Sequence, residues 1–230
     1  MPIFDRTESK NHQVIDRWDG GIGWIAHPDE DSRRASHAVV GDNGGVWLID
    51  PLDTPDLDVL LDEVGEEVVG IAILSELHIR DAGILADRYG VPVFVPEEMD
   101  GIAERVEAPI ERCSETLGDS GFRIHRFEYD TIAYRDSDRT LYVPDLLGTV
   151  SFYTVGDERI GLFLLGRISP PKDLNDFVPD RILVGHGAGI LTDASAALTD
   201  ALRGARRRFP RALLTNGLKQ MRATYTAMKE

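Results

Sequence analysis

Residues 68–83 read Val-Val-Gly-Ile-Ala-Ile-Leu-Ser-Glu-Leu-His-Ile-Arg-Asp-Ala-Gly. The first seven are apolar apart from a glycine, as is typical of a strand that is buried on both faces. A polar loop follows, and then residues 79–89 place Ile84, Leu85 and Tyr89 on one helical face. The stretch therefore predicts a buried strand, a loop that carries His78, and a helix.

Short β-branched or aromatic runs lie on both sides of this stretch, and turn-forming residues separate them. They predict strands at 23–26, 38–40, 46–49, 91–95, 122–124, 131–134, 140–143, 160–164 and 181–184. Thr54 and Pro55 are typical of a helix start, whereas residues 97–120 are acidic and irregular. A last helix is expected from Thr192 or Asp193, with an alanine- and leucine-rich stripe over residues 194–205.

This order of elements predicts an α/β fold in which two sheets pack together with helices outside. We expect one domain over residues 1–230, because no linker or repeat interrupts the chain. A simple doubly wound sheet would alternate more regularly and would present a glycine-rich phosphate loop, which the sequence lacks.

The composition is strongly acidic, with 40 Asp and Glu against 25 Lys and Arg, a net charge of −15, and only four lysines. Concentrated salt screens such self-repulsion, so the composition indicates a halophilic source. No apolar segment is long enough to span a bilayer or to act as a signal peptide. The single Cys113 cannot form an internal disulfide, and we expect a cytoplasmic protein.

Charge is unevenly distributed, because residues 201–230 carry a net charge of +7 and the remainder carries −22. A basic segment on an acidic protein can bind the phosphates of nucleic acid. It can also dock on the acidic face of its own chain. Docking is favoured, because aromatic residues suited to base stacking are sparse in this segment.

Five strings occur in the order typical of one superfamily. They are Val-Trp-Leu-Ile-Asp-Pro at 46–51, the 71–83 stretch, Val-Pro-Val at 91–93, Leu-Tyr-Val-Pro-Asp at 141–145 and Ile-Leu-Val-Gly-His-Gly at 182–187. With them the chain resembles a degenerate, haloarchaeal-type member of the metallo-β-lactamase superfamily. The resemblance implies an αββα sandwich with two mixed sheets, and metal ions held at loop ends.

The superfamily's His-x-His-x-Asp-His motif fits residues 76–83 in two registers. In one, Glu76, His78, Arg80 and Asp81 occupy the motif's positions; in the other, Asp81 holds the aspartate position and Leu77, Ile79 and Ala82 replace histidines. The first is favoured because Gly83 then falls on the family's glycine. The histidine that the family has before its bridging aspartate is absent, and Glu128 or Asp130 could substitute for it.

The resemblance implies a metal site formed by His78, Asp81, Asp145 and His186, with Asp81 or Glu76 as ligand or general base. Such a site would hold at most one zinc, iron or manganese ion, whose water would attack an ester, thioester or related bond of a small molecule. The alternative is a pseudoenzyme without metal that binds an anionic ligand or a protein partner. The positive charge of Arg80 opposes a bound cation, so Arg80 would either swing outward or occupy the vacated metal site and pair with Asp81 or Asp145. In the pseudoenzyme, Arg80 would replace the charge of the metal.

Overall fold

The computed structural model describes residues 2–65, 67–127 and 130–227. A seven-stranded sheet contains its strands in chain order, antiparallel from the first to the fourth and parallel from the fourth to the seventh. The strands are β1 (Gln13–Trp18), β2 (Gly21–Ile25), β3 (Ala35–Val40), β4 (Val46–Ile49), β5 (Val68–Ala72), β6 (Val93–Pro96) and β7 (Ile110–Cys113).

The second sheet has four strands in the order β13-β10-β9-β8. They are β8 (Arg123–Phe127), β9 (Asp130–Arg135), β10 (Thr140–Val143) and β13 (Arg181–Val184). β10 and β13 are parallel neighbours, so their carboxyl ends lie at the same edge of the sheet. A small ribbon of β11 (Leu147–Gly148) and β12 (Gly161–Leu162) lies beyond that edge.

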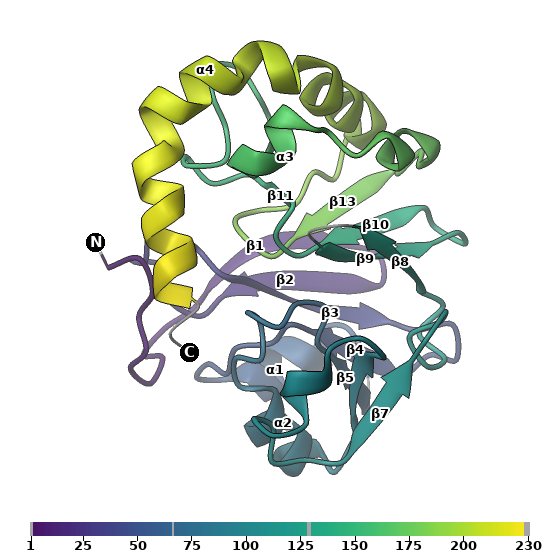
Figure 1. Cartoon of the computed structure of the whole chain (residues 1–230). Helices are drawn as coiled ribbons and strands as arrows, with labels where there is room; N and C mark the ends of the chain where they lie inside the picture. Colours follow the sequence, from purple (N-terminus) through teal and green to yellow (C-terminus); the bar gives the residue numbers. More distant parts are fainter. Residues whose placement is uncertain (1, 66, 128–129, 228–230) are drawn as a thin grey trace.

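The inner faces of the two sheets share one apolar cluster, in which Trp47 and Phe94 of the first sheet meet Tyr142 and Leu183 of the second. Helices α1 (Leu57–Asp62) and α2 (Ala82–Tyr89) cover the outer face of the first sheet. Helices α3 (Leu164–Ile168) and α4 (Ala194–Ala227) lie on the other side of the molecule, and α4 packs on the second sheet (Figure 1). These layers confirm the predicted αββα sandwich.

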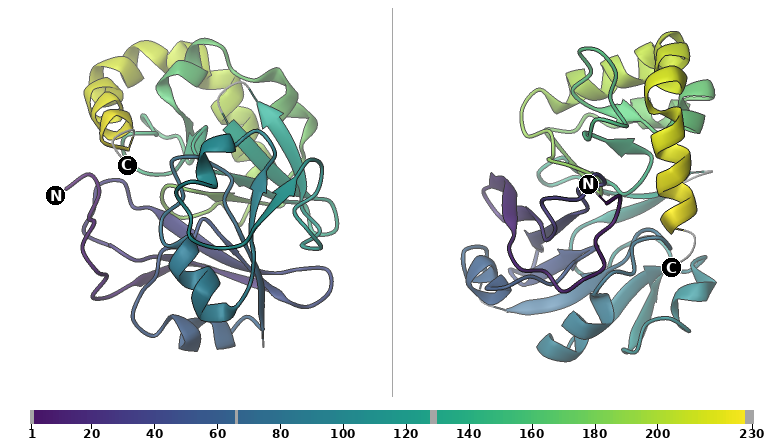
Figure 2. Two further views of the ribbon diagram at one scale, coloured as in Figure 1. Left: turned by 60° about the horizontal axis from the view of Figure 1, so that its bottom comes forward. Right: turned by 90° about the vertical axis from the view of Figure 1, so that its left-hand side faces the viewer.

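Helix α4 is an arc that runs over the second sheet and then down one side of the molecule (Figure 2). Its last turns reach the N-terminal segment, where Arg6 Nη2 donates a hydrogen bond to the carbonyl oxygen of Thr226 at 3.1 Å. Gln220 fixes the same part of α4, because its amide donates to Phe152 O at 2.6 Å and accepts from Leu164 N at 2.8 Å. None of the helices in the described residues is long and apolar enough to cross a bilayer.

Several element boundaries differ from the sequence-based expectations. β7 lies inside the stretch expected to be irregular, and only one of its four side chains is buried, so no apolar pattern announces it. α1 begins after Asp56, and α2 begins at Ala82 because a turn occupies residues 79–81. The expected strand at 160–164 is divided between β12 and α3, and β1 was not expected.

Part of the basic segment docks on carboxylates of its own chain. Arg208 lies 2.8 Å from an oxygen of Asp200 and 3.5 Å from one of Glu158. Glu158 also pairs with Arg167, and neither side chain of that pair is exposed to solvent. Asp200 belongs to α4 itself, so the contact with Glu158 is the one that attaches the middle of α4 to the loop before β12.

Candidate metal centre

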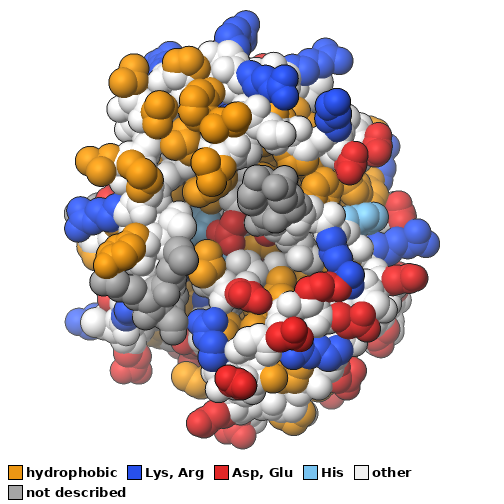
Figure 3. Space-filling model, viewed as in Figure 1, with side chains coloured by type: hydrophobic (Ala, Val, Ile, Leu, Met, Phe, Trp, Pro, Cys, Tyr) orange, Lys and Arg blue, Asp and Glu red, His pale blue; other side chains and the backbone are white. Residues whose placement is uncertain are grey.

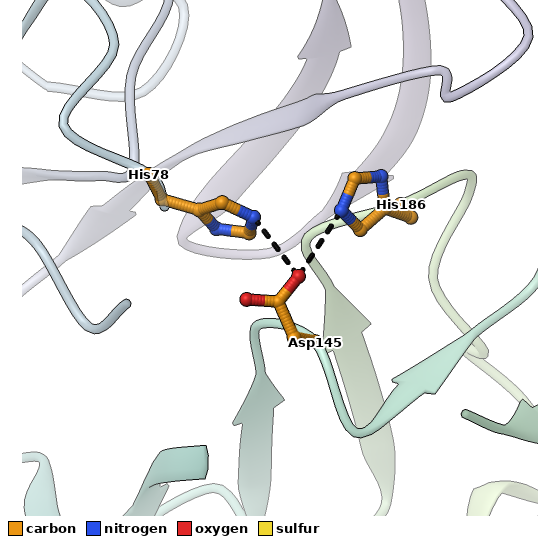
Figure 4. Close-up of side chains that lie close together, drawn as sticks. All are labelled: His78, Asp145 and His186. Carbon is orange, nitrogen blue, oxygen red and sulfur yellow. Dashed lines mark hydrogen bonds and ion pairs between the residues drawn. The ribbon is translucent and has the colours of Figure 1, made fainter. Parts of the chain in front are cut away.

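Three side chains from three separate loops converge between the two halves of the sandwich. His78 follows β5, Asp145 follows β10 and His186 follows β13. Asp145 Oδ1 lies 3.2 Å from His78 Nε2 and 3.3 Å from His186 Nε2 (Figure 4). One ligand atom from each residue lies within 4.8 Å of the others, which is the spacing of a group that could share one ion.

The glycine before His186 permits this close approach. A Cβ atom on Gly185 would lie within 2.5 Å of His78 Cε1, so any larger residue would push the two loops apart. The glycine after it, Gly187, has a φ of 95°, which residues with a side chain rarely adopt. The two glycines therefore let the chain turn and present the imidazole of His186 to the other loops.

Both imidazoles are held from behind by an acceptor. His186 Nδ1 donates to the carbonyl oxygen of Ser32 at 2.9 Å, and His78 Nδ1 lies 2.8 Å from Asp50 Oδ2. Asp50 is itself fixed by hydrogen bonds from Leu74 N and the Tyr142 hydroxyl. Metal-ligating histidines typically donate their other ring nitrogen to a carboxylate or carbonyl in this way, which directs the Nε2 lone pair at the ion.

Asp145 is positioned equally closely. Its Oδ2 accepts a hydrogen bond from Ser75 Oγ at 2.7 Å, and its backbone carbonyl accepts one from the Tyr153 hydroxyl at 2.7 Å. The Tyr153 ring also stacks on His186, with centroids 5.9 Å apart. Oδ1 is thus left facing the two imidazole nitrogens, as a monodentate ligand would.

The charges in this cluster interact strongly. Burial and the nearby Arg80 lower the pKa of His78, but Asp145 and Asp50 outweigh them and raise it to about 9. Burial raises the pKa of Asp145, but His78 and His186 outweigh it and hold that pKa well below its ordinary value. In the metal-free protein His78 is therefore an imidazolium that donates to Asp50 and Asp145.

Metal binding is consequently expected to release about one proton at neutral pH, because His78 must lose the Nε2 proton before that nitrogen can coordinate. Below pH 9 the apparent affinity should rise by up to about tenfold per pH unit, and it should level off above the His78 pKa. Calorimetric titration with zinc at pH 7 in two buffers of different ionisation enthalpy measures the proton count directly. A heat of binding that is the same in both buffers would show that His78 does not have to be deprotonated.

Asp130 lies next to the cluster, but its carboxyl group is not one of the three possible metal ligands. Its Oδ2 accepts hydrogen bonds from the backbone N–H groups of Asp145 at 3.0 Å and Leu146 at 2.7 Å. Burial and the neighbouring charge of Asp145 raise the pKa of Asp130 well above its ordinary value. Asp130 thus holds the loop that presents Asp145, and Glu128, the other expected substitute, lies outside the described residues.

Asp81 and Glu76 lie apart from the three converging ligands. Asp81 stands at the start of α2, where its Oδ2 accepts a hydrogen bond from Asp53 N at 2.8 Å, so the structure separates it from His78, Asp145 and His186. Arg80, which has a φ of 50°, and the next residue, Asp81, bond to different parts of the chain: Arg80 to carbonyl oxygens beside the cluster and Asp81 to Asp53 N. Glu76 is exposed and lines the cavity above the cluster.

Arg80 neither swings outward nor pairs with Asp81 or Asp145. Its guanidinium donates to the backbone carbonyl oxygens of Ala35, Asp50 and Gly185. These carbonyls belong to or directly follow β3, β4 and β13, so one cation joins both sheets next to the cluster. Arg80 therefore acts as a cross-link behind His78 rather than as a replacement for an ion.

Sequence reasoning missed Asp50, Ser32, Ser75 and Tyr153. Asp50 directly follows a predicted strand and precedes a proline, a position that could have drawn attention to it. Ser32 contributes only a backbone carbonyl, which no side-chain pattern reveals.

No protein-family model and no curated protein matches the sequence. Among solved structures, the chain is similar to the DIM-1 metallo-β-lactamase, with 13% identity, a TM-score of 0.60, and coverage of 86% of this chain and 100% of the other. It is similar to a metallo-β-lactamase from Pontibacter korlensis, with 13% identity, a TM-score of 0.61, and coverage of 85% and 99%. A third similar structure, of a protein in a di-iron-bound form, has 18% identity, a TM-score of 0.50, and coverage of 72% and 93%. The chain has the metallo-β-lactamase fold.

Proposed function

We propose that this chain is a metal-dependent hydrolase that binds one divalent ion through His78, Asp145 and His186. The observation that carries the proposal is that both Nε2 atoms face one oxygen of Asp145 while both Nδ1 atoms are engaged behind them. Two imidazoles and a carboxylate suit zinc, iron or manganese, and three protein ligands leave a position open for chemistry.

A second ion is not part of the proposal. In the described part of the chain, this trio is the one group of three close histidine, cysteine or acidic ligands. Arg80 occupies the motif position at which the superfamily has an aspartate, and its positive charge next to His78 opposes another cation nearby.

A bound ion would supply Lewis acidity and lower the pKa of a coordinated water toward neutrality. The protein's own groups would do the rest. Asp50 and the Ser32 carbonyl fix the two rings, and Ser75 and Asp130 fix Asp145. Glu76, an exposed carboxylate at the rim of the same cavity, is the residue to which we assign proton transfer.

The test is hydrolysis of neutral esters and thioesters by protein loaded with zinc, manganese or iron(II). Activity should require metal and disappear in His186→Ala. Glu76→Gln should lower kcat by about 10²- to 10⁴-fold, as is usual for a general acid or base. Asp81→Asn, the matched control in the same loop, should retain activity. Metal-loaded wild-type protein that is no faster than His186→Ala across the panel would refute the proposal.

A pseudoenzyme is the second candidate, and one observation favours it. Without an ion, a protonated His78 donates to Asp145, Asp50 balances the charge of that His78, and His186 Nε2 lies 3.3 Å from the same Asp145 oxygen. The cluster would then be a buried polar connection between three loops. This candidate predicts that metal neither binds nor stabilises the protein.

A further inference from the structure

A cavity of about 560 Å³ lies directly above the His78–Asp145–His186 cluster. Its walls are mostly apolar and come from distant parts of the chain, among them Phe4, Met99, Phe127, Phe152 and Phe163. Figure 3 shows acidic and histidine atoms at the bottom of a hollow between the two halves of the molecule, with hydrophobic side chains around it. The volume is in the range of cavities that enclose a small organic ligand.

The last turns of α4 form one wall of this cavity. Ala223 and Ala227 line it with small side chains. Gln220 bonds to Phe152 O and so ties this part of the helix to the aromatic loop, which carries Phe152 and Tyr153 between β11 and β12. The small side chains at these positions leave space on the α4 side of the cavity. A large side chain at Ala223 would take up part of that space.

The cavity offers no available cation among the described residues that line it. Its one arginine is Arg34, whose guanidinium is bound by the buried Glu30, at 3.0 Å from Nε and 2.9 Å from Nη2, and by the carbonyl oxygen of Asp5. The protonated His78 also lines the cavity, but its two ring nitrogens are engaged by Asp50 and Asp145. Four acidic side chains line the same space, those of Glu76, Glu98, Asp130 and Asp145, and of these Asp130 has a pKa raised well above its ordinary value by burial and by the charge of Asp145. Glu98 alone of these pairs with an arginine, Arg126.

An anionic group on a ligand would therefore lose its hydration and meet carboxylates instead of a partner. Like charges a few ångströms apart repel by several kcal/mol at intermediate dielectric. An apolar group, in contrast, gains from leaving water for the aromatic walls. The same chemistry argues against the anionic ligand considered for a pseudoenzyme.

We propose that this cavity takes an uncharged ligand with an apolar acyl or aromatic group, and that the substrates of the site are neutral esters or thioesters of that kind. The assignment of a substrate rests on the proposed hydrolase, whereas the assignment of a ligand class rests on the cavity alone. The acyl group lies against Phe152, Phe163 and the end of α4, and the scissile carbonyl reaches the cluster below.

Binding to the metal-free protein tests the ligand class without any catalysis. Octanamide and octanoate share one apolar tail and differ in charge, and butanamide has a shorter tail. In calorimetry at pH 8, octanamide should bind at least about tenfold more tightly than octanoate. Each methylene from butanamide to octanamide should add about threefold to fourfold in affinity.

Ala223→Trp should reduce octanamide affinity by at least about tenfold, because the indole occupies the cavity. Arg222→Trp is the matched control, since it adds the same side chain at the neighbouring, exposed position of α4. Circular dichroism establishes that both variants are folded. Octanoate binding as tightly as octanamide, or an Ala223→Trp protein that binds like Arg222→Trp, would overturn the proposal.

The two proposals fail in different ways. If the protein binds octanamide but hydrolyses no ester with any metal, the proposed hydrolase activity is refuted and the proposed ligand class stands. If the protein is a metal-dependent hydrolase that prefers short or anionic esters, the proposed ligand class is refuted and the proposed hydrolase activity stands.

Discussion

A protein in which alanine replaces His186 is expected to bind zinc at least about 1000-fold more weakly than the wild type. Loss of a residue that merely supports a ligand typically costs 10- to 100-fold in metal affinity, and His186 would itself be one of three ligands. Competition against a chromophoric chelator measures the affinity, and the absorption spectrum of the cobalt-substituted protein reports the change in ligands.

Two further substitutions give this experiment its controls. Asp81→Ala should leave zinc affinity unchanged, because Asp81 bonds to Asp53 N instead of facing the cluster. Asp50→Asn should weaken zinc binding by about 10- to 100-fold. It removes the carboxylate that orients His78 but leaves all three proposed metal ligands in place. An unchanged affinity in His186→Ala, or a large loss in Asp81→Ala, would contradict the assigned ligand set.

Replacement of Arg80 by methionine is expected to lower the free energy of unfolding by about 2–4 kcal/mol. The substitution removes a guanidinium that donates to three backbone carbonyls at strand ends and leaves those acceptors without it. Arg80→Lys should lose less stability than Arg80→Met but more than none, because an ammonium group lacks the planar, forked set of N–H donors that lets a guanidinium bond to carbonyls on different strands. Urea denaturation at fixed high salt provides the measurement.

The matched control for Arg80 is Arg88→Met, which removes an exposed arginine that pairs with Asp53 near the same helix. Surface ion pairs contribute about 0–1 kcal/mol, so this variant should be nearly as stable as the wild type. If Arg80→Met cost no more than Arg88→Met, Arg80 would not be the cross-link between the sheets that its contacts describe.

The sequence was sufficient to predict the fold, because its strongest patterns are those that the sandwich buries. The apolar run at 68–74 became β5 and its exit, and the runs at 140–143 and 181–184 became β10 and β13 at their expected positions. The edge strand β7 could not be predicted, because its exposed Glu111 and Arg112 give it no apolar pattern.

Three of the four ligands expected from the sequence lie close together in the structure, and the prediction was simplest where a residue closely follows a buried strand. Asp145 and His186 do so, and the structure brings them together with His78. Asp81 faces Asp53 N instead of the cluster, after a residue with a positive φ that no sequence pattern at Arg80 reveals. The apolar cavity was also hidden, because its walls come from Phe4, the aromatic loop and the end of α4, which are far apart in sequence.

The metal content of the wild-type protein tests the central claim most directly. Protein purified without an affinity tag at high salt, saturated with zinc and freed of excess by gel filtration, should retain about one ion per chain by elemental analysis. His186→Ala treated in the same way should retain close to none. A wild-type protein that retains none, or as much as His186→Ala, would contradict the account.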